Sequence, residues 1–106
     1  MATIKLRKWD VVEHLRTEED MALYLDACLE EAGDDASFIA KVLGDIARAK
    51  GMTQLARDTG LGRESLYKAL SGAGNPSFAT ILKVMSALGL QLHATPRRAH
   101  TEIVVP

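Results

Sequence analysis

The chain has 106 residues, of which 47% are apolar and 25% are charged. This length and composition suit one domain with a single core, and they exclude a chain that is disordered throughout. No apolar run approaches the roughly 18 residues of a membrane span, and acidic residues interrupt the basic N-terminus before a signal-peptide core can form. We therefore expect a cytoplasmic protein that has no membrane partner.

Charge is divided unevenly along the chain, although the net charge is only −1. Residues 1–50 hold seven Lys and Arg against eleven Asp and Glu, whereas residues 51–106 hold six against three. The second half suits a polyanion, and the acidic first half suits a basic partner. Alternatively, the acidic half is simply a solvated face.

Residues with metal-binding or catalytic chemistry are few and scattered. Cys28 is the only cysteine, so it forms no internal disulfide, and it lies on an apolar helix stripe that favours packing. His14, His93 and His100 show no ligand spacing, and no nucleophile, base and orienting residue stand out as a set. We expect no cofactor, no metal and no catalytic site, and therefore no enzyme.

Residues 1–16 are predicted to form an arm and a short helix. Ile4 and Leu6 alternate with polar residues, as in an extended segment. Asp10 with Glu13 three residues later resembles a capping box, and Trp9 precedes that cap.

Residues 17–89 are predicted to form a helical domain. Its first helix begins at Thr17, a capping residue that three acidic residues follow. Gly33 and the pair at residues 34–35 end this helix and cap the next, which ends near Gly51 and contains Gly44, indicating a close helix crossing. The two apolar stripes are Met21, Tyr24, Leu25, Cys28 and Leu29, and Phe38, Ile39, Val42, Leu43 and Ile46.

The last predicted helix follows a turn at Asn75 and Pro76 and begins at Pro76 or Ser77. Its apolar stripe is Phe78, Ile81, Leu82, Met85 and Leu88. Residues 90–106 are predicted to form a C-terminal strand and tail. The strand, residues 90–95, would pair with residues 4–6, with residues 103–105 or with a second copy across a two-fold axis. The predicted fold class is all-α, with five helices and short extended or β segments at the termini.

Residues 53–70 contain two short predicted helices and a sharp turn. Thr53 caps a helix over residues 54–59, and Gly60 supplies the positive φ that the turn requires. The second helix covers residues 63–70. Its packing face is Leu66, Ala69 and Leu70, and its opposite face is Glu64, Tyr67, Lys68 and Ser71, with Arg63 flanking both.

The spacing within this segment favours a helix-turn-helix over an ordinary hairpin. Ala56 is small where the helices cross, Gly60 follows four residues later, and Leu61 is buried at the joint. In a helix-turn-helix the second helix enters the major groove of DNA.

Two strings are more specific than this spacing: GDIARAKGMTQLARDTGL and RESLYKALS followed by GNPSFATILKVMSALGL. They resemble the helix-turn-helix domain of the addiction-module antidote family, the HigA-like antitoxins of the Xre-type DNA-binding superfamily. The likeness covers about residues 9–95 and implies a lambda-repressor-like helix-turn-helix domain. Gly62 departs from it, because a capping Ser is more usual there.

The resemblance implies a homodimer that represses its own operon and neutralises a co-encoded toxin, typically a small basic ribonuclease similar to RelE. In operator DNA, Arg63 or Lys68 would donate to guanine, and Glu64 would accept from cytosine or orient Arg63. Tyr67 would pack on a sugar or a thymine methyl. The predicted phosphate contacts are Thr53, Gln54, Ser71 and Asn75.

The side chains on the outward face of the second helix also fit a role that needs no DNA. Arg63 with Tyr67, and Glu64 with Lys68, are spaced as helix-surface pairs worth about 0.2–0.5 kcal/mol. The alternative functions are a generic Xre-type repressor without a toxin partner and a toxin-binding module that does not bind DNA.

Overall fold

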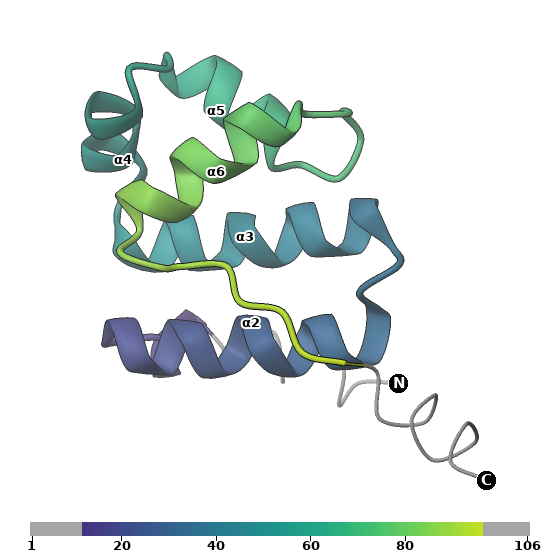
Figure 1. The fold of residues 1–106 in the computed structure, drawn as a ribbon. Coiled ribbons are helices and arrows are strands. Elements are labelled where there is room, and N and C mark those ends of the chain that lie inside the picture. Colours follow the sequence, from purple (N-terminus) through teal and green to yellow (C-terminus); the bar gives the residue numbers. More distant parts are fainter. Residues whose placement is uncertain (1–11, 97–106) are drawn as a thin grey trace, which may run out of the picture.

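The computed structural model describes residues 12–96, which form helices joined by short loops (Figure 1). A helical turn at residues 12–14 precedes five helices. These are α2 (Glu18–Ala32), α3 (Ala36–Lys50), α4 (Met52–Thr59), α5 (Arg63–Ala69) and α6 (Phe78–Ala87). The all-α fold class is confirmed, and none of the helices in residues 12–96 is long and apolar enough to cross a membrane. The predictions for residues 4–6, 9–10 and 103–105 lie outside the described residues.

Three helix starts follow the predicted capping chemistry. The Thr17 hydroxyl accepts from the Asp20 N–H at 3.0 Å, and the Asp20 carboxylate accepts from the Thr17 N–H at 3.2 Å, which completes a capping box. Asp35 caps α3 by accepting from the Phe38 N–H at 3.0 Å. Ser77 caps α6 by accepting from the Thr80 N–H at 3.1 Å, so Ser77 rather than Pro76 starts that helix.

Helix α3 lies in the middle of the molecule. In Figure 1, α2 runs along one side of it, and α4, α5 and α6 form a layer on the other side. The middle of α3 is therefore buried on most of its faces. Its buried residues are Ala40, Val42, Leu43, Gly44, Asp45, Ile46 and Ala47. A helix buried on both sides is apolar over most of its surface, which explains why its stripe is broad.

One carboxylate is buried in this central helix, and it is hydrogen-bonded. Asp45 is 4% exposed; it accepts from the Tyr24 hydroxyl at 3.1 Å and from Arg48 Nη2 at 2.6 Å. Burial raises the pKa of Tyr24, and the Asp45 charge raises it further, so the hydroxyl stays protonated and donates at physiological pH. The pair joins α2 to α3 and offsets the cost of burying the charge.

The apolar face of α6 differs from the predicted one. Phe78 is 66% exposed and Leu82 is 42% exposed, whereas Val84, which the predicted stripe omits, is fully buried. Ile81, Val84, Met85 and Leu88 form the face that packs on the core. The buried face of α6 is centred on Val84, Met85 and Leu88. Phe78 and Leu82 lie at the edge of this face, so their side chains remain largely exposed. Phe38 on α3 is likewise 38% exposed.

The predicted C-terminal strand does not form within the described residues. The Leu90 N–H donates to the Met85 carbonyl at 2.9 Å, and Leu90 packs against the core. Residues 91–96 then run extended past α3 toward α2, as the yellow-green trace in Figure 1 shows. Residues 12–96 offer this segment no partner strand, so it forms no ladder of backbone hydrogen bonds.

Gly44 allows α3 and the end of α5 to approach closely. A Cβ at Gly44 would lie 2.8 Å from the Leu70 carbonyl oxygen, which is closer than real Cβ contacts. The close crossing that the sequence indicates at this glycine is confirmed. It seats Leu70, which is 4% exposed, against α3 and thereby holds the C-terminal end of α5.

Gly44→Ala is expected to lower the free energy of unfolding by about 1–3 kcal/mol, because backbone must shift to accommodate the methyl group. Urea unfolding measures the change. Gly62→Ser is the control, since nothing lies within 4 Å of a Cβ there, and it should change stability by less than about 0.5 kcal/mol or raise it. Equal stability of Gly44→Ala and wild type would show that the crossing is loose.

Candidate nucleic-acid interface

The first helix of the candidate interface begins two residues earlier than predicted. Gly51, at φ 121°, ends α3 and is the N-cap of α4, so no side chain caps this helix. Thr53 is therefore an exposed second residue of α4 rather than its cap, which corrects the prediction. The chain breaks at Gly51, and Met52 directly after it packs in the core at 8% exposure as the first residue of the helix.

The turn between α4 and α5 is held by one buried hydroxyl. Thr59 is 7% exposed, and its Oγ1 donates to the Leu55 carbonyl at 2.9 Å and accepts from the Leu61 N–H at 3.2 Å. Gly60 follows in the left-handed conformation at φ 76°, as predicted, and its N–H donates to the Ala56 carbonyl at 3.1 Å. These bonds fix where α5 begins.

Helix α5 has the two faces that its sequence predicts. Leu66 is fully buried, Leu70 just beyond the helix is 4% exposed, and Ala69 is partly buried. The opposite face carries Arg63, Glu64, Tyr67 and Lys68, all of which are exposed. The helix begins at Arg63 after Gly62, which provides no side-chain cap, and ends at Ala69, one residue before the predicted end.

The structure brings Arg63 and Tyr67 together. The guanidinium carbon of Arg63 lies 5.7 Å from the centroid of the Tyr67 ring, and its Nη2 is 3.4 Å from the hydroxyl. Such an exposed pair is worth about 0.5–1 kcal/mol, which is small enough for a stronger ligand to displace. Glu64 and Lys68 form no ion pair in the described structure, so the other predicted surface pair is absent there.

The remaining predicted residues lie apart from this pair. Gln54, on α4, donates from Nε2 to Asp58 Oδ1 at 2.9 Å. The Ser71 hydroxyl donates to the Lys68 carbonyl at 3.0 Å and accepts from the Ala73 N–H at 3.1 Å, so it shapes the loop after α5. Asn75 is exposed farther along the same loop.

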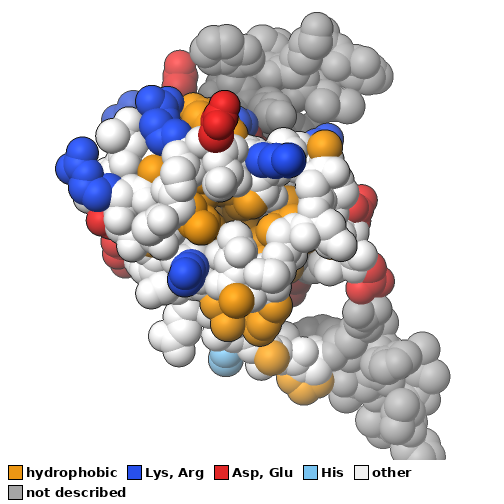
Figure 2. All heavy atoms as spheres, turned by 90° about the horizontal axis from the view of Figure 1, so that it is seen from above, with side chains coloured by type: hydrophobic (Ala, Val, Ile, Leu, Met, Phe, Trp, Pro, Cys, Tyr) orange, Lys and Arg blue, Asp and Glu red, His pale blue; other side chains and the backbone are white. Residues whose placement is uncertain are grey.

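Figure 2 shows the layer of α4, α5 and α6 from above. Lys and Arg side chains lie across this face, and acidic side chains lie mainly toward its margins. Residues 52–87 contain four Lys and Arg and two Asp and Glu, so this layer is weakly basic. Among the described residues, no group of three or more His, Cys, Asp or Glu is placed to hold a metal ion.

Comparison with known proteins identifies the family. Residues 5–96 match the model of the family described as "Probable addiction module antidote protein". The chain belongs to this family of addiction-module antidotes. The match covers the described helices α2 to α6 together, so α4 and α5 and the acidic α2 are parts of one family unit.

A curated relative is similar in sequence. The chain is 54% identical over 96 residues to an uncharacterized protein of Haemophilus influenzae (strain ATCC 51907 / DSM 11121 / KW20 / Rd). The alignment covers 91% of this chain and 97% of the relative, so the two proteins are similar over nearly their whole lengths. No solved structure matches the antidote.

Two residues of the antidote's site are not found by sequence reasoning. The sequence predicts Thr59 only as the last residue of a helix, and it does not single out Asp58, although Asp58 holds the Gln54 amide. The signal for Thr59 is a β-branched residue with a hydroxyl directly before the turn glycine. Asp58 stands four residues after Gln54, which is the spacing of helix-surface hydrogen bonds.

Thr59→Val is expected to destabilise the antidote by about 1–2 kcal/mol, because it replaces the hydroxyl by a methyl group and leaves the Leu61 N–H unpaired. Hydrogen exchange measured by NMR should show faster exchange of the Leu61 amide. Thr59→Ser keeps the hydroxyl and should keep that amide protected. Equal protection of the Leu61 amide in both variants would show that the Thr59 hydroxyl does not hold the turn.

Proposed function

We propose that the antidote is the antitoxin of a type II toxin–antitoxin module that also represses its own operon. In this proposal it neutralises a RelE-like ribonuclease and binds operator DNA as a dimer in the cytoplasm, as a non-enzymatic regulator. The family match over residues 5–96 supports the antitoxin role. The exposed polar face of α5, whose other face is buried, supports the DNA-binding role.

The DNA contacts are assigned by position on α4 and α5. Arg63 and Lys68 lie on the outward face of α5 and donate to guanine in the major groove, with Tyr67 beside them against a sugar or thymine methyl. To bind, Arg63 leaves its weak contact with the Tyr67 ring. Glu64 accepts from cytosine or orients Arg63.

Phosphate contacts are assigned to Thr53 and Gln54 at the start of α4, where backbone N–H groups and the helix dipole favour anions. Asn75 adds a contact from the loop after α5. Ser71 is a weaker candidate than the sequence predicts, because its hydroxyl already donates to the Lys68 carbonyl and accepts from the Ala73 N–H. The weakly basic surface requires two copies for firm binding.

The second copy is proposed to pack on α6. Phe78 and Leu82 are 66% and 42% exposed and lie four residues apart on one side of this helix. Large exposed apolar side chains at this spacing gain most by pairing with their own copies across a two-fold axis. Such an axis beside the α5 layer would direct two α5 helices toward the same side, as half-sites about 34 Å apart require.

A toxin-binding module that does not bind DNA is the second candidate. The bond from Gln54 to Asp58 and the contact between Arg63 and Tyr67 favour it, since both pairs satisfy side chains that DNA would otherwise engage. Binding to promoter DNA separates the two candidates.

Lys68→Ala and Arg63→Ala are each expected to weaken binding to the antidote's own promoter by about tenfold or more, because each removes a donor to a base or phosphate. Gel shifts over a series of salt concentrations measure this. Arg16→Ala, a charge change beside α2 on the other side of α3, should leave affinity nearly unchanged. If wild-type protein at micromolar concentration formed no specific complex with promoter DNA, the DNA-binding role would be excluded and the toxin-binding module would remain.

Phe78→Asp is expected to convert the dimer into a monomer, because the new charge would be buried between copies. Light scattering at tens of micromolar protein measures the mass. Leu23→Asp is the control, since Leu23 is 70% exposed on α2, in the other layer. A monomeric wild type at high micromolar concentration would contradict the dimer.

A further inference from the structure

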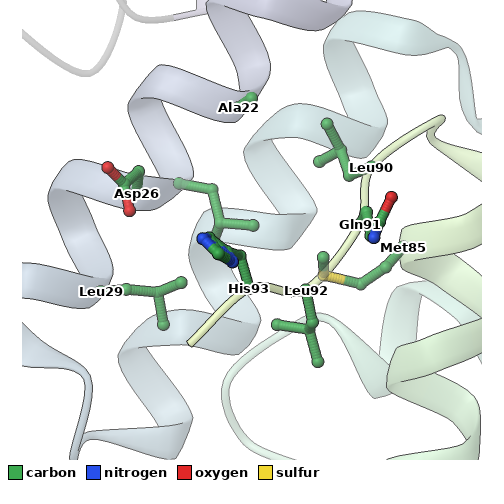
Figure 3. A pocket seen from close by; sticks show the side chains of 9 residues that line it. Ala22, Asp26, Leu29, Met85, Leu90, Gln91, Leu92 and His93 are labelled. Atoms are coloured by element: carbon green, nitrogen blue, oxygen red, sulfur yellow. The ribbon is translucent and has the colours of Figure 1, made fainter. Parts of the chain in front are cut away.

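A shallow groove lies between α2 and the extended segment that follows α6 (Figure 3). Its volume is about 80 Å³. Ala22, Asp26 and Leu29 of α2 line one side, Leu92 and His93 line the other, and the buried Met85 lies beneath. Most of the wall is apolar, and Leu92 remains 42% exposed at its edge. A groove of this size and lining fits one or two apolar side chains of a partner.

The helix that forms one wall of the groove lies in an acidic segment of the chain, and Asp26 of that helix lines the groove. Residues 17–40 contain eight of the 14 Asp and Glu of the chain and none of its 13 Lys and Arg. Thirteen basic and six acidic residues remain elsewhere, so the rest of the chain carries a net charge of +7. The acidic segment is α2 with its flanks, and it forms one wall of the groove.

Some of these carboxylates have structural roles, and others are free to meet a partner. Glu18 pairs with Lys50 at 3.2 Å, and Asp20 and Asp35 belong to helix caps. Asp26 and Glu30 are exposed, form no ion pair in the described structure and lie four residues apart on α2. Like charges at this spacing repel, so a basic partner would relieve a repulsion that the free antidote retains.

The position of the groove separates it from the candidate DNA-binding helix. α2 and α5 lie on opposite sides of α3 (Figure 1). The hydrogen bond from Tyr24 to Asp45 ties α2 to α3, so the groove wall belongs to the rigid body of the domain. A partner on α2 therefore leaves the outward face of α5 accessible.

We infer that this groove, with Asp26 in its wall and Glu30 four residues farther along α2, is the docking site for a basic protein partner, which inserts an apolar side chain between Lys or Arg residues. This inference rests on the proposed function in taking that partner to be the toxin. Charge complementarity sets the orientation, and the apolar contact with Leu92 and Leu29 supplies the desolvated centre. Toxin and operator then bind the same antidote at once.

The test uses the full antidote and, as the probe, the purified product of the toxin gene beside its own gene, with binding measured by calorimetry. The double variant Asp26→Lys/Glu30→Lys should weaken binding by about 30-fold or more, because it turns attraction into repulsion. Leu92→Asp should weaken it by about tenfold or more. All three side chains are exposed, so the fold should be retained. Asp58→Lys makes one such charge reversal on α4, half the change of the double variant, and should have little effect.

The outcomes separate failure of the groove from failure of the antitoxin role, and they test the second copy and simultaneous binding. Tight wild-type binding that both groove variants retain would overturn the groove and leave the antitoxin role intact. Failure of wild type to bind the toxin would overturn both. If light scattering showed a dimeric wild type and a monomeric Leu92→Asp variant, the groove would be the contact site for a second copy, and the inference would be overturned. Operator binding that survives toxin saturation in a gel shift would support simultaneous binding.

Discussion

The burial of α3 on both sides is the constraint on which the rest of the structure depends. α2 covers one side and the layer of α4 to α6 covers the other, so the buried residues of α3 are apolar or small with one exception. The exception is Asp45, whose burial is tolerated because Tyr24 and Arg48 both donate to it. The same helix thus holds an acidic surface and a weakly basic surface apart in one small domain.

Helix α5, the candidate DNA-binding helix, owes its position to contacts made by residues outside it. Gly44 lets Leu70 seat against α3, and Thr59 fixes the turn that precedes Arg63. The loop after α5 is also tied to α3, since the Ser37 hydroxyl donates to the Gly72 carbonyl. A helix of seven residues is too short to be stable alone, so these contacts, rather than its own propensity, hold its exposed face.

Charge is distributed across the layers as well as along the chain. The acidic residues of α2 lie on one side of α3, and the α5 side is weakly basic. In the proposed function the protein binds both a basic toxin and an anionic DNA, and the two would not compete because the acidic and the weakly basic surfaces lie on opposite sides of α3. This arrangement agrees with an addiction-module antidote and offers a physical reason for its uneven charge.

Local patterns in the sequence determined the helices, the caps at Thr17, Asp35 and Ser77, the turn at Gly60 and the two faces of α5, because caps, turns and periodicity depend on neighbours in the chain. Tertiary structure decided the rest. It exposed Phe78, and it made Gly51 rather than Thr53 the N-cap of α4. It also left residues 91–96 without a ladder of backbone hydrogen bonds and paired Gln54 with Asp58. Those outcomes depend on which surfaces other helices cover and on which groups lack a hydrogen-bond partner. Neither can be predicted from the local pattern of residues.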